Sequence, residues 1–425
     1  MTNPKLALIP SGYKGGTNPT VYSILPNDGS GDFDYERNGN ATRVRKDGLI
    51  EELTVDDTPR LDWLNSDCPS LLLEPQRVNR QFYSEQINNA VWTKVSTTVT
   101  ADQTIAPSGE YTADKVQRTS TVANYVIDSA SKSASAELDI TTSMFVKKGE
   151  GDFFAIRQQG SYPNRGEVKY QFSTNTITTS VAGSDFTVVG SSVEDYGNGW
   201  VRISATFNTD ASSTVSTLFI PRATDGTVDA SDTSDSAYAY VWGVQVEEGY
   251  LTSYIKTEGS TVTRLFDDLE SDTSYSTGND VTWFLDFDTY TFENSFRAAM
   301  VVRNSGFTQS MDLISYNSGS DYYIRIRATN QSALQTIIAF GEDAIQMFRR
   351  NKVAVRLYGS NFEIYVNGTR EYTGTSDDGD WTLLNNSAIL NDFGTTSERP
   401  STKLYDFRVY DQTMTQSELE ELTTL

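Results

Sequence analysis

Apolar and polar residues alternate in short runs along most of the chain, and this pattern predicts β-strands. In the run GWVRISATF at 199–207, one face collects Val201, Ile203, Ala205 and Phe207. Successive strand residues point to opposite faces, so we expect this face to pack in a core. The run YAYVWGVQVEEG at 238–249 is nearly continuously apolar, which is typical of a buried central strand.

Strand patterns continue in the C-terminal third of the chain. The stretch KVAVRLYGSNFEIYVNGTREY at 352–372 carries two turn signals and predicts a three-stranded meander, with Asn367-Gly368 at the second turn. The tail at 415–425 predicts a helix, because Thr415 and Glu418 can form a capping box before an apolar face.

Short strands separated by turn signals predict an all-β protein with two tandem β-sandwiches. We expect a jelly-roll domain at 80–257 and a second sandwich at 281–425. Residues 258–280 are polar and acidic and are predicted to be a linker. Residues 1–79 are rich in turn formers and cannot bury much surface alone, so we expect an extended arm that orders against its own domain or a partner.

Composition excludes several classes of function. The formal net charge is −23, which disfavours binding to nucleic acid phosphates or an anionic membrane. Histidine is absent, so histidine triads and histidine–metal sites are excluded. A single cysteine, Cys68, excludes an intrachain disulfide and a thiolate zinc site. The start MTNPKLALIP does not read as a signal peptide, so we expect synthesis in the cytoplasm without secretory export.

Several segments resemble a family of bacteriophage virion structural proteins. Residues 11–52, PRLDW, CPSLLLEPQRVN and YSEQINNAVWTK resemble a recurrent N-terminal block of these proteins. GWVRISATF and VWGVQVEEGYLTSYIKTEGSTVTR resemble the late strands and exit of their carbohydrate-binding-like jelly roll. FEIYVNG and LYDFRVYDQTMTQSELEEL resemble the concanavalin A-like, laminin-G-like (LamG) fold, in which a short acidic helix follows the last strand.

The resemblance implies a structural protein, such as a fibre or capsid decoration, on the surface of a phage head or tail. It implies that residues 1–79 attach to other virion proteins, that the protein is a homotrimer, and that the sandwiches bind glycans of the host or environment. It transfers no catalytic residues, so we expect no enzymatic activity.

Two kinds of residue are candidates for ligand binding: aromatic residues expected at the surface, and aspartates clustered in Gly-rich loops. Trp381 lies at a loop–strand edge, and adjacent Tyr322 and Tyr323 must point to opposite faces of a strand, so these rings are candidates for stacking on sugars. A structural calcium ion would require clustered oxygen ligands. The clusters are Asp28, Asp32 and Asp34 in one Gly-rich loop, and Asp377, Asp378 and Asp380 in another. The alternative explanation of both clusters is turn chemistry, since Asp and Gly form turns without any metal.

Two alternative functions remain open. A polysaccharide depolymerase would need two carboxyl groups close together. Asp286 and Asp288 share a strand face but have no evident third partner. The run AELDITT resembles the catalytic pattern E-x-D-x-x-E with Glu137 and Asp139, but Thr142 stands where the second glutamate belongs. A purely architectural capsid cement protein would need no ligand at all.

Overall fold

A computed structural model describes residues 3–12, 20–128, 132–133, 139–184, 186–209, 214–271, 280–290, 297–303, 310–318, 321–330, 333–339, 349–359, 361–375, 387–389 and 401–425. For 128, 132–133, 214, 289–290, 375, 387–389 and the strands within 297–339, only the backbone is described. Within these ranges almost every regular element is a β-strand, accompanied by one α-helix, α1 (Gln416–Thr423), and a 3-10 turn, η1 (Pro10–Gly12). The prediction of an all-β protein built from sandwiches is confirmed.

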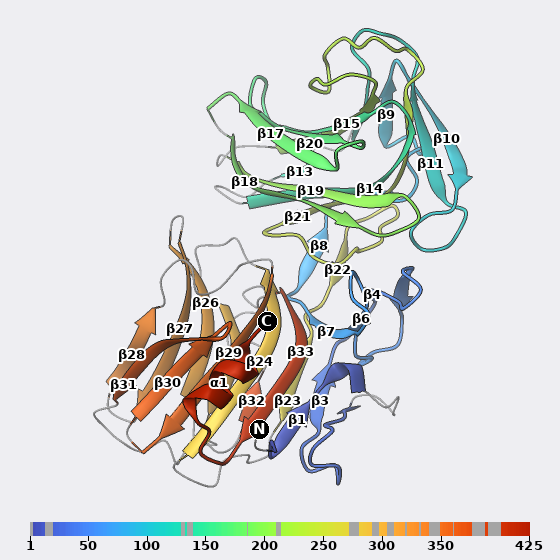
Figure 1. Cartoon of the computed structure of the whole chain (residues 1–425). Helices are drawn as coiled ribbons and strands as arrows, with labels where there is room; N and C mark the ends of the chain where they lie inside the picture. Colours follow the sequence, from blue (N-terminus) through green and yellow to red (C-terminus); the bar gives the residue numbers. More distant parts are fainter. Residues whose placement is uncertain are drawn as a thin grey trace. The chain divides into compact units, whose positions relative to one another are not determined.

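The chain divides into two compact units, coloured by sequence in Figure 1. The first unit comprises Met1–Arg43, Leu53–Gln76 and Leu265–Leu425, and the second unit comprises Val44–Glu52 and Arg77–Arg264. This division differs from the domain boundaries expected from the sequence. Residues 1–79 are shared between the two units, and so are residues 258–280.

The second unit is a sandwich of two antiparallel sheets. In the described strands, the first sheet has the order β10 (Thr97–Thr104), β11 (Ala113–Arg118), β21 (Tyr238–Glu248), β14 (Asp139–Glu150), β19 (Trp200–Thr209), β18 (Phe186–Asp195). The opposing sheet has the order β17 (Thr176–Ala182), β16 (Arg165–Gln171), β15 (Phe153–Gln159), β20 (Thr214–Arg222), β12 (Tyr125–Asp128), β9 (Trp92–Val95), and β13 (Lys132–Ser133) also pairs with β20. A ribbon of β8 (Arg77–Asn79) and β22 (Val262–Arg264) accompanies them.

The core of the second unit lies between these sheets. Ile203, Ala205 and Phe207 of β19 are buried in it together with residues such as Phe154 and Phe219 of the opposing sheet, and Val201 packs against it. The alternation in GWVRISATF therefore predicted the buried face correctly.

The first unit also contains two antiparallel sheets. In its described strands, one sheet has the order β31 (Thr369–Thr375), β30 (Asn361–Val366), β29 (Arg350–Tyr358), β24 (Asp280–Tyr290), β33 (Ser401–Tyr410), β7 (Ser70–Leu73), β6 (Leu61–Asp62), with β1 (Leu6–Leu8) also paired to β33. The other has the order β2 (Thr20–Val21), β3 (Phe33–Glu36), β23 (Asp268–Ser271), β32 (Ser387–Ile389), β25 (Arg297–Arg303), β26 (Ser310–Ser318), β27 (Asp321–Asn330), β28 (Ala333–Ala339). A small hairpin of β4 (Ala41–Val44) and β5 (Ile50–Leu53) is shared between the units, because Val44–Glu52 belong to the second unit.

The N-terminal segment is part of this sandwich. β1 and β7 both pair with β33, near the other end of the sequence, and Figure 1 shows blue β1 beside red β33. Leu6, Leu8 and Phe33 are fully buried in the same core as Trp283 and Phe407. Of the two expectations for the arm, the structure shows ordering against its own chain, because these apolar side chains complete the C-terminal sandwich.

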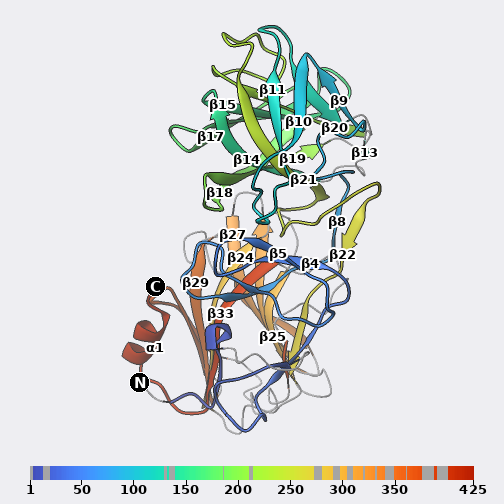
Figure 2. The same ribbon diagram turned by 90° about the vertical axis from the view of Figure 1, so that its right-hand side faces the viewer.

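The predicted meander and C-terminal helix are both present. β29, β30 and β31 are consecutive neighbours, with Asn367 at φ 48° in the second turn. Thr415 and Glu418 form the capping box of α1. Leu419 and Leu422 pack on Phe284 on the face of the sheet opposite the core, and Figure 2 shows α1 beside β29.

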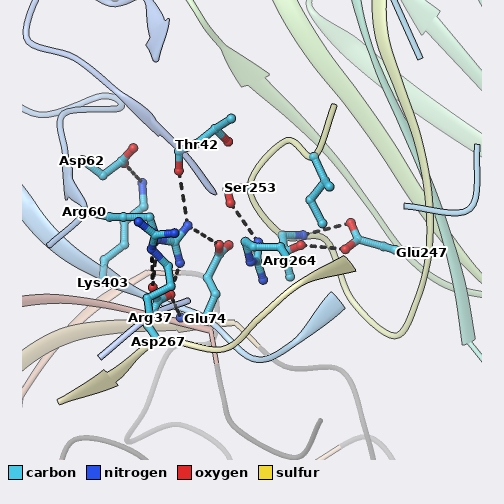
Figure 3. Close-up of polar contacts among 12 residues, drawn as sticks. Arg37, Thr42, Arg60, Asp62, Glu74, Glu247, Ser253, Arg264, Asp267 and Lys403 are labelled. Carbon is cyan, nitrogen blue, oxygen red and sulfur yellow. Dashed lines mark hydrogen bonds and ion pairs between the residues drawn. The ribbon is translucent and has the colours of Figure 1, made fainter. Parts of the chain in front are cut away.

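A buried ion network joins the N-terminal segment to the segment expected to be a linker (Figure 3). Arg60 donates hydrogen bonds to both carboxylate oxygens of Asp267 and, over 2.7 Å, to Oε2 of Glu74. Asp267 also accepts from the backbone N–H of Glu74 at 2.8 Å and from the hydroxyl of Tyr35. The side chains of Arg60 and Asp267 are fully buried. Burial and the neighbouring Asp267 raise the pKa of Tyr35 well above its ordinary value.

Among the described residues, no helix has the length and apolar character needed to cross a membrane.

Candidate functional site

The ligand residues named from the sequence fall mainly outside the described side chains. Tyr322 and Tyr323 lie on β27, where their Cα partners on β26 are Asn317 and Tyr316, but only the backbone is described there. Trp381, Asp377, Asp378 and Asp380 lie outside the described residues.

Asp28 and Asp32, in the other predicted calcium loop, act in turns. Asp28 accepts hydrogen bonds from the backbone N–H and hydroxyl of Ser30, at 3.0 and 2.7 Å. Asp32 accepts from the backbone N–H and hydroxyl of Ser23, at 2.8 and 3.1 Å. No group of three metal-ligating side chains occurs in the part of the chain that the structure describes.

The outer face of the β15–β20 sheet in the second unit is covered by the loop at 223–237. Val228 of this loop packs against Ala155, Leu218 and Ile220. The guanidinium of Arg222 donates to the backbone oxygens of four loop residues, Thr224, Thr227, Ala230 and Ser231, at 2.8–3.1 Å. This face is therefore occupied by the chain itself.

The outer face of the β14–β21 sheet is covered along only part of its length. Directly opposite residues of an antiparallel pair point to the same face, and Phe145 is opposite both Trp242 and Arg202. The ring of Tyr254, from the segment after β21, lies 4.6 Å from the Trp242 ring and 6.0 Å from the Phe145 ring. Because Tyr254 covers them, Phe145 and Trp242 are buried.

The next row of the same face is partly open to solvent. Lys115 of β11 and Lys147 of β14 both lie directly opposite Tyr240 of β21, one on each side. The side chains of these three residues are half-buried. Lys147 is also opposite Trp200, which is buried and donates its indole N–H to the Ile105 carbonyl at 3.0 Å. This row of the sheet therefore presents an accessible tyrosine, Tyr240, between two lysines, and the buried Trp200 packs beside it.

Tyr238, two residues before Tyr240, holds one of these lysines in place. The ammonium of Lys115 lies 4.0 Å from the centroid of the Tyr238 ring, which is a cation–π contact. A Cβ atom at Gly149 would overlap this ring and would lie 2.6 Å from the Tyr238 backbone oxygen. Glycine at position 149 therefore allows the Tyr238 ring to pack against β14, where it contacts the Lys115 ammonium.

Tyr111 completes the group, which we call the tyrosine–lysine cluster: Tyr111, Lys115, Lys147, Tyr238 and Tyr240. Tyr111 is 61% exposed, and its hydroxyl donates to the Gln103 carbonyl at 3.0 Å. The rings of Tyr238 and Tyr240 are edge-on at 5.8 Å. Partial burial, followed by the nearby hydroxyls of Tyr238 and Tyr111, raises the pKa of Tyr240. The hydroxyl of Tyr240 therefore stays a neutral donor and acceptor near pH 7.

The side chains of the tyrosine–lysine cluster suit ligand binding better than acid–base catalysis. It offers phenol hydroxyls, ring edges and two ammonium groups, which suit a hydroxyl-bearing polar ligand. Sequence reasoning missed it because 238–249 read as a wholly buried strand. The signal was the spacing Tyr-x-Tyr-x-Trp, which puts Tyr238, Tyr240 and Trp242 on one face, whereas only the tertiary structure decides which of them is covered.

The carboxylates of the first unit form a separate cluster that bears on the depolymerase alternative. Asp286 lies directly opposite Asp406 of β33, a partner that was not evident from the sequence. Asp286 accepts two hydrogen bonds from Arg350 at 2.6 and 2.7 Å, and Asp406 accepts two from Arg408 at 3.0 and 2.5 Å. Burial raises the pKa of Asp406, and Arg408 opposes that rise. Each carboxylate of this pair is therefore occupied by an ion pair with an arginine.

Comparison with known proteins yields only distant structural likeness. No family model matches the chain, and no curated protein matches it. The carbohydrate-binding module (CBM40) of Ruminococcus gnavus IT-sialidase, solved with α2,3-sialyllactose, is 16% identical, with 35% of this chain and 83% of that chain covered and a TM-score of 0.29. Domain 4 of the Geobacillus stearothermophilus arabinanase AbnA is 15% identical over 42% of this chain and 83% of its own, with a TM-score of 0.29. A Limulus polyphemus pentraxin is 12% identical over 36% of this chain and 73% of its own, also at 0.29. These scores are too low to carry an argument about function.

Proposed function

We propose that the chain is a non-enzymatic, glycan-binding β-sandwich protein and that the tyrosine–lysine cluster is its glycan contact. The observation that carries the proposal is the opening in the outer face of the β14–β21 sheet. The same face is covered by Tyr254 over Phe145 and Trp242, but it is left accessible at Tyr240 and Tyr238.

Sugars present hydroxyl groups and apolar C–H faces, and the cluster matches both. The three phenols can donate and accept hydrogen bonds, while their rings supply apolar surface with few rotatable bonds. A contact made by these few side chains of a single protomer would bind a glycan weakly. A homotrimer, which the resemblance to virion proteins implies, would raise the avidity by presenting several copies together.

We further propose that the protein is displayed on a phage virion, on the basis of the resemblance of its N-terminal block. Phe33 of this block is buried in the first unit, together with Leu6 and Leu8 from the residues just before it. Attachment to a capsid or tail protein would therefore use the surface residues of the block. Ile24 and Leu25 of the block are exposed apolar candidates, and so is Val55, which lies between two segments of the block.

The alternative of a depolymerase is not favoured by the described carboxylates. Glycoside hydrolysis needs one carboxyl group that is protonated when it donates to the leaving oxygen. In Asp286 and Asp406, the opposed pair of the first unit, both oxygens of each carboxylate already accept hydrogen bonds from an arginine, so they are not available to a leaving oxygen. The alternative of a ligand-free cement protein is tested by the same experiment as glycan binding.

The test is a glycan array probed with the full-length protein and two tyrosine variants. Tyr240→Ala should weaken binding to every recognised glycan by about tenfold or more, since aromatic contacts dominate such sites. Tyr162→Ala is the matched control, because Tyr162 is a 75% exposed tyrosine of the second unit outside the cluster. Absence of any glycan binding, or equal losses in the two variants, would refute the proposal. Immunogold labelling of intact virions tests the display separately.

A further inference from the structure

The two lysines of the tyrosine–lysine cluster have no acidic partner among the described residues. Most basic side chains near the surface of the second unit do have one: Lys148 contacts Asp152 at 2.9 Å, and Lys169 contacts Asp225 at 2.7 Å. The printed contact of Lys115 is with a neutral ring, that of Tyr238. Two uncompensated ammonium groups are notable in a chain with a net charge of −23.

The strand register places the two lysines on either side of one tyrosine, although their stems lie over different neighbours: the Lys115 ammonium contacts the Tyr238 ring, and the Lys147 stem passes beside Gly199. Lys115 and Lys147 flank Tyr240 on the two neighbouring strands and point to the same face. Adjacent strands lie about 4.8 Å apart, so the two Cα atoms are separated by roughly 10 Å. Each lysine carries a four-carbon stem, and together they can reach a single small group held above the Tyr240 ring.

One of the two ammonium groups is already positioned without a ligand. The Tyr238 ring lies against Gly149 on one side and holds the Lys115 ammonium at 4.0 Å. A neutral ring does not compensate the charge of the ammonium group, whereas a paired carboxylate does, so Lys115 can still attract an anionic ligand.

We propose that the ligand of this cluster is an anionic glycan, whose acidic group binds above Tyr240 between Lys115 and Lys147. This inference rests on the proposed function and names the class of its ligand. The acidic group is a carboxylate of a uronic-type sugar or a sulfate ester, since both present the same anionic oxygens to ammonium donors.

The neighbouring charges also set the direction of the bound sugar. Glu150 lies opposite Tyr238 on β14, is exposed, and accepts a hydrogen bond from the Ser236 hydroxyl at 3.3 Å. It would repel an anion at that end of the cluster. The acidic group therefore lies on the Tyr240 side of the Lys115 ammonium, and neutral hydroxyls of the glycan face Glu150.

The experiment compares each glycan recognised on the array with a partner that differs only in charge. Carboxylated glycans are tested before and after chemical reduction of the carboxyl groups, and sulfated glycans before and after desulfation. Affinity for the native anionic form should exceed affinity for the neutral form by about tenfold, and it should fall as the salt concentration rises. A loss of affinity after carboxyl reduction identifies a uronic-type ligand, and a loss of affinity after desulfation identifies a sulfated ligand.

Two lysine variants and one control connect the charge effect to the cluster. Lys115→Gln and Lys147→Gln should each lower the affinity for the anionic glycan about fivefold and lower the affinity for its neutral partner clearly less. Lys148→Gln, which removes the neighbouring lysine paired with Asp152, should change neither. Thermal melting of each variant establishes that it is folded.

The outcomes separate this inference from the proposed function. Glycan binding that is insensitive to reduction, desulfation and both lysine variants overturns the anionic ligand and leaves glycan binding standing. Lack of binding to any glycan overturns both.

Discussion

The guanidinium of Arg60 and the carboxylate of Asp267 form a fully buried ion pair between residues that lie 207 positions apart in the chain. Glu74 and Tyr35 bind the same two groups, so the pair sits where the N-terminal segment meets the C-terminal sandwich of the first unit. Removing one partner leaves an uncompensated buried charge.

Asp267→Ala should therefore lower the free energy of unfolding of the first unit by about 3–5 kcal/mol. Hydrogen exchange measured by mass spectrometry across a denaturant series would report the first unit separately from the second. The control is Asp411→Ala, which removes a surface ion pair with Lys5 that also joins the two ends of the chain. It should cost less than about 1 kcal/mol. Equal effects of the two changes would contradict the central role of Asp267.

Gly149→Ala should displace the Tyr238 ring, because the added methyl group would overlap it. The expected cost is about 1–3 kcal/mol in the stability of the second unit, as in other overpacked sites. The protons beside the Lys115 ammonium should also lose the ring-current shift that the Tyr238 face imposes in an NMR spectrum. Gly259→Ala is the control, since its methyl group would meet only the Tyr83 side chain, at 3.2 Å. An unchanged Lys115 shift in Gly149→Ala would contradict the described packing.

Asp114 of β11 should titrate with a pKa of about 6, because burial raises it above its ordinary value. The folded state then binds the proton more tightly than the unfolded chain does between about pH 4 and pH 6. The contribution of Asp114 to stability is therefore fully present below about pH 4 and is lost as the pH rises through 6. Carboxyl NMR titration gives the pKa directly, and Asp114→Asn should reduce the pH dependence of unfolding over this window. A midpoint below pH 4.5 would contradict the expectation.

Leu419→Ala should destabilise the first unit by about 2–5 kcal/mol, because Leu419 is fully buried between α1 and the sheet. Leu425→Ala, two residues beyond α1, removes a leucine that is 61% exposed and should cost less than about 0.5 kcal/mol. Denaturant unfolding of both variants measures the difference. Similar denaturant midpoints for the two variants would show that packing of the apolar face of α1 does not stabilise the first unit.

The local pattern of the sequence was sufficient to predict individual elements. Residues 199–207 form most of β19 with the predicted buried face, 352–372 form the meander, and Thr415 caps α1. These features depend on the two-residue period of a strand and on contacts within a few residues, so they can be read from neighbours in the sequence.

The site could be predicted less well. The rings of Tyr238 and Trp242 have the same spacing and face as that of Tyr240, but the segment containing Tyr254 covers only Trp242. Exposure of a residue in the middle of a sheet depends on which distant segment crosses it, and alternation along one strand carries no information about that crossing. Trp381, the ring favoured from the sequence, lies outside the described residues, so its role stays a prediction.

The sequence by itself determined the all-β class, the strands and the helix, because these follow from local periodicity and capping. Only the tertiary structure decided that β1 and β7 complete the sheet around β33, and that the expected linker supplies Asp267 to a buried charge network. It alone placed two lysines on either side of Tyr240. Such pairings are set by the edges and charges that remain unsatisfied after the local elements have formed, and those partners can lie anywhere in the chain.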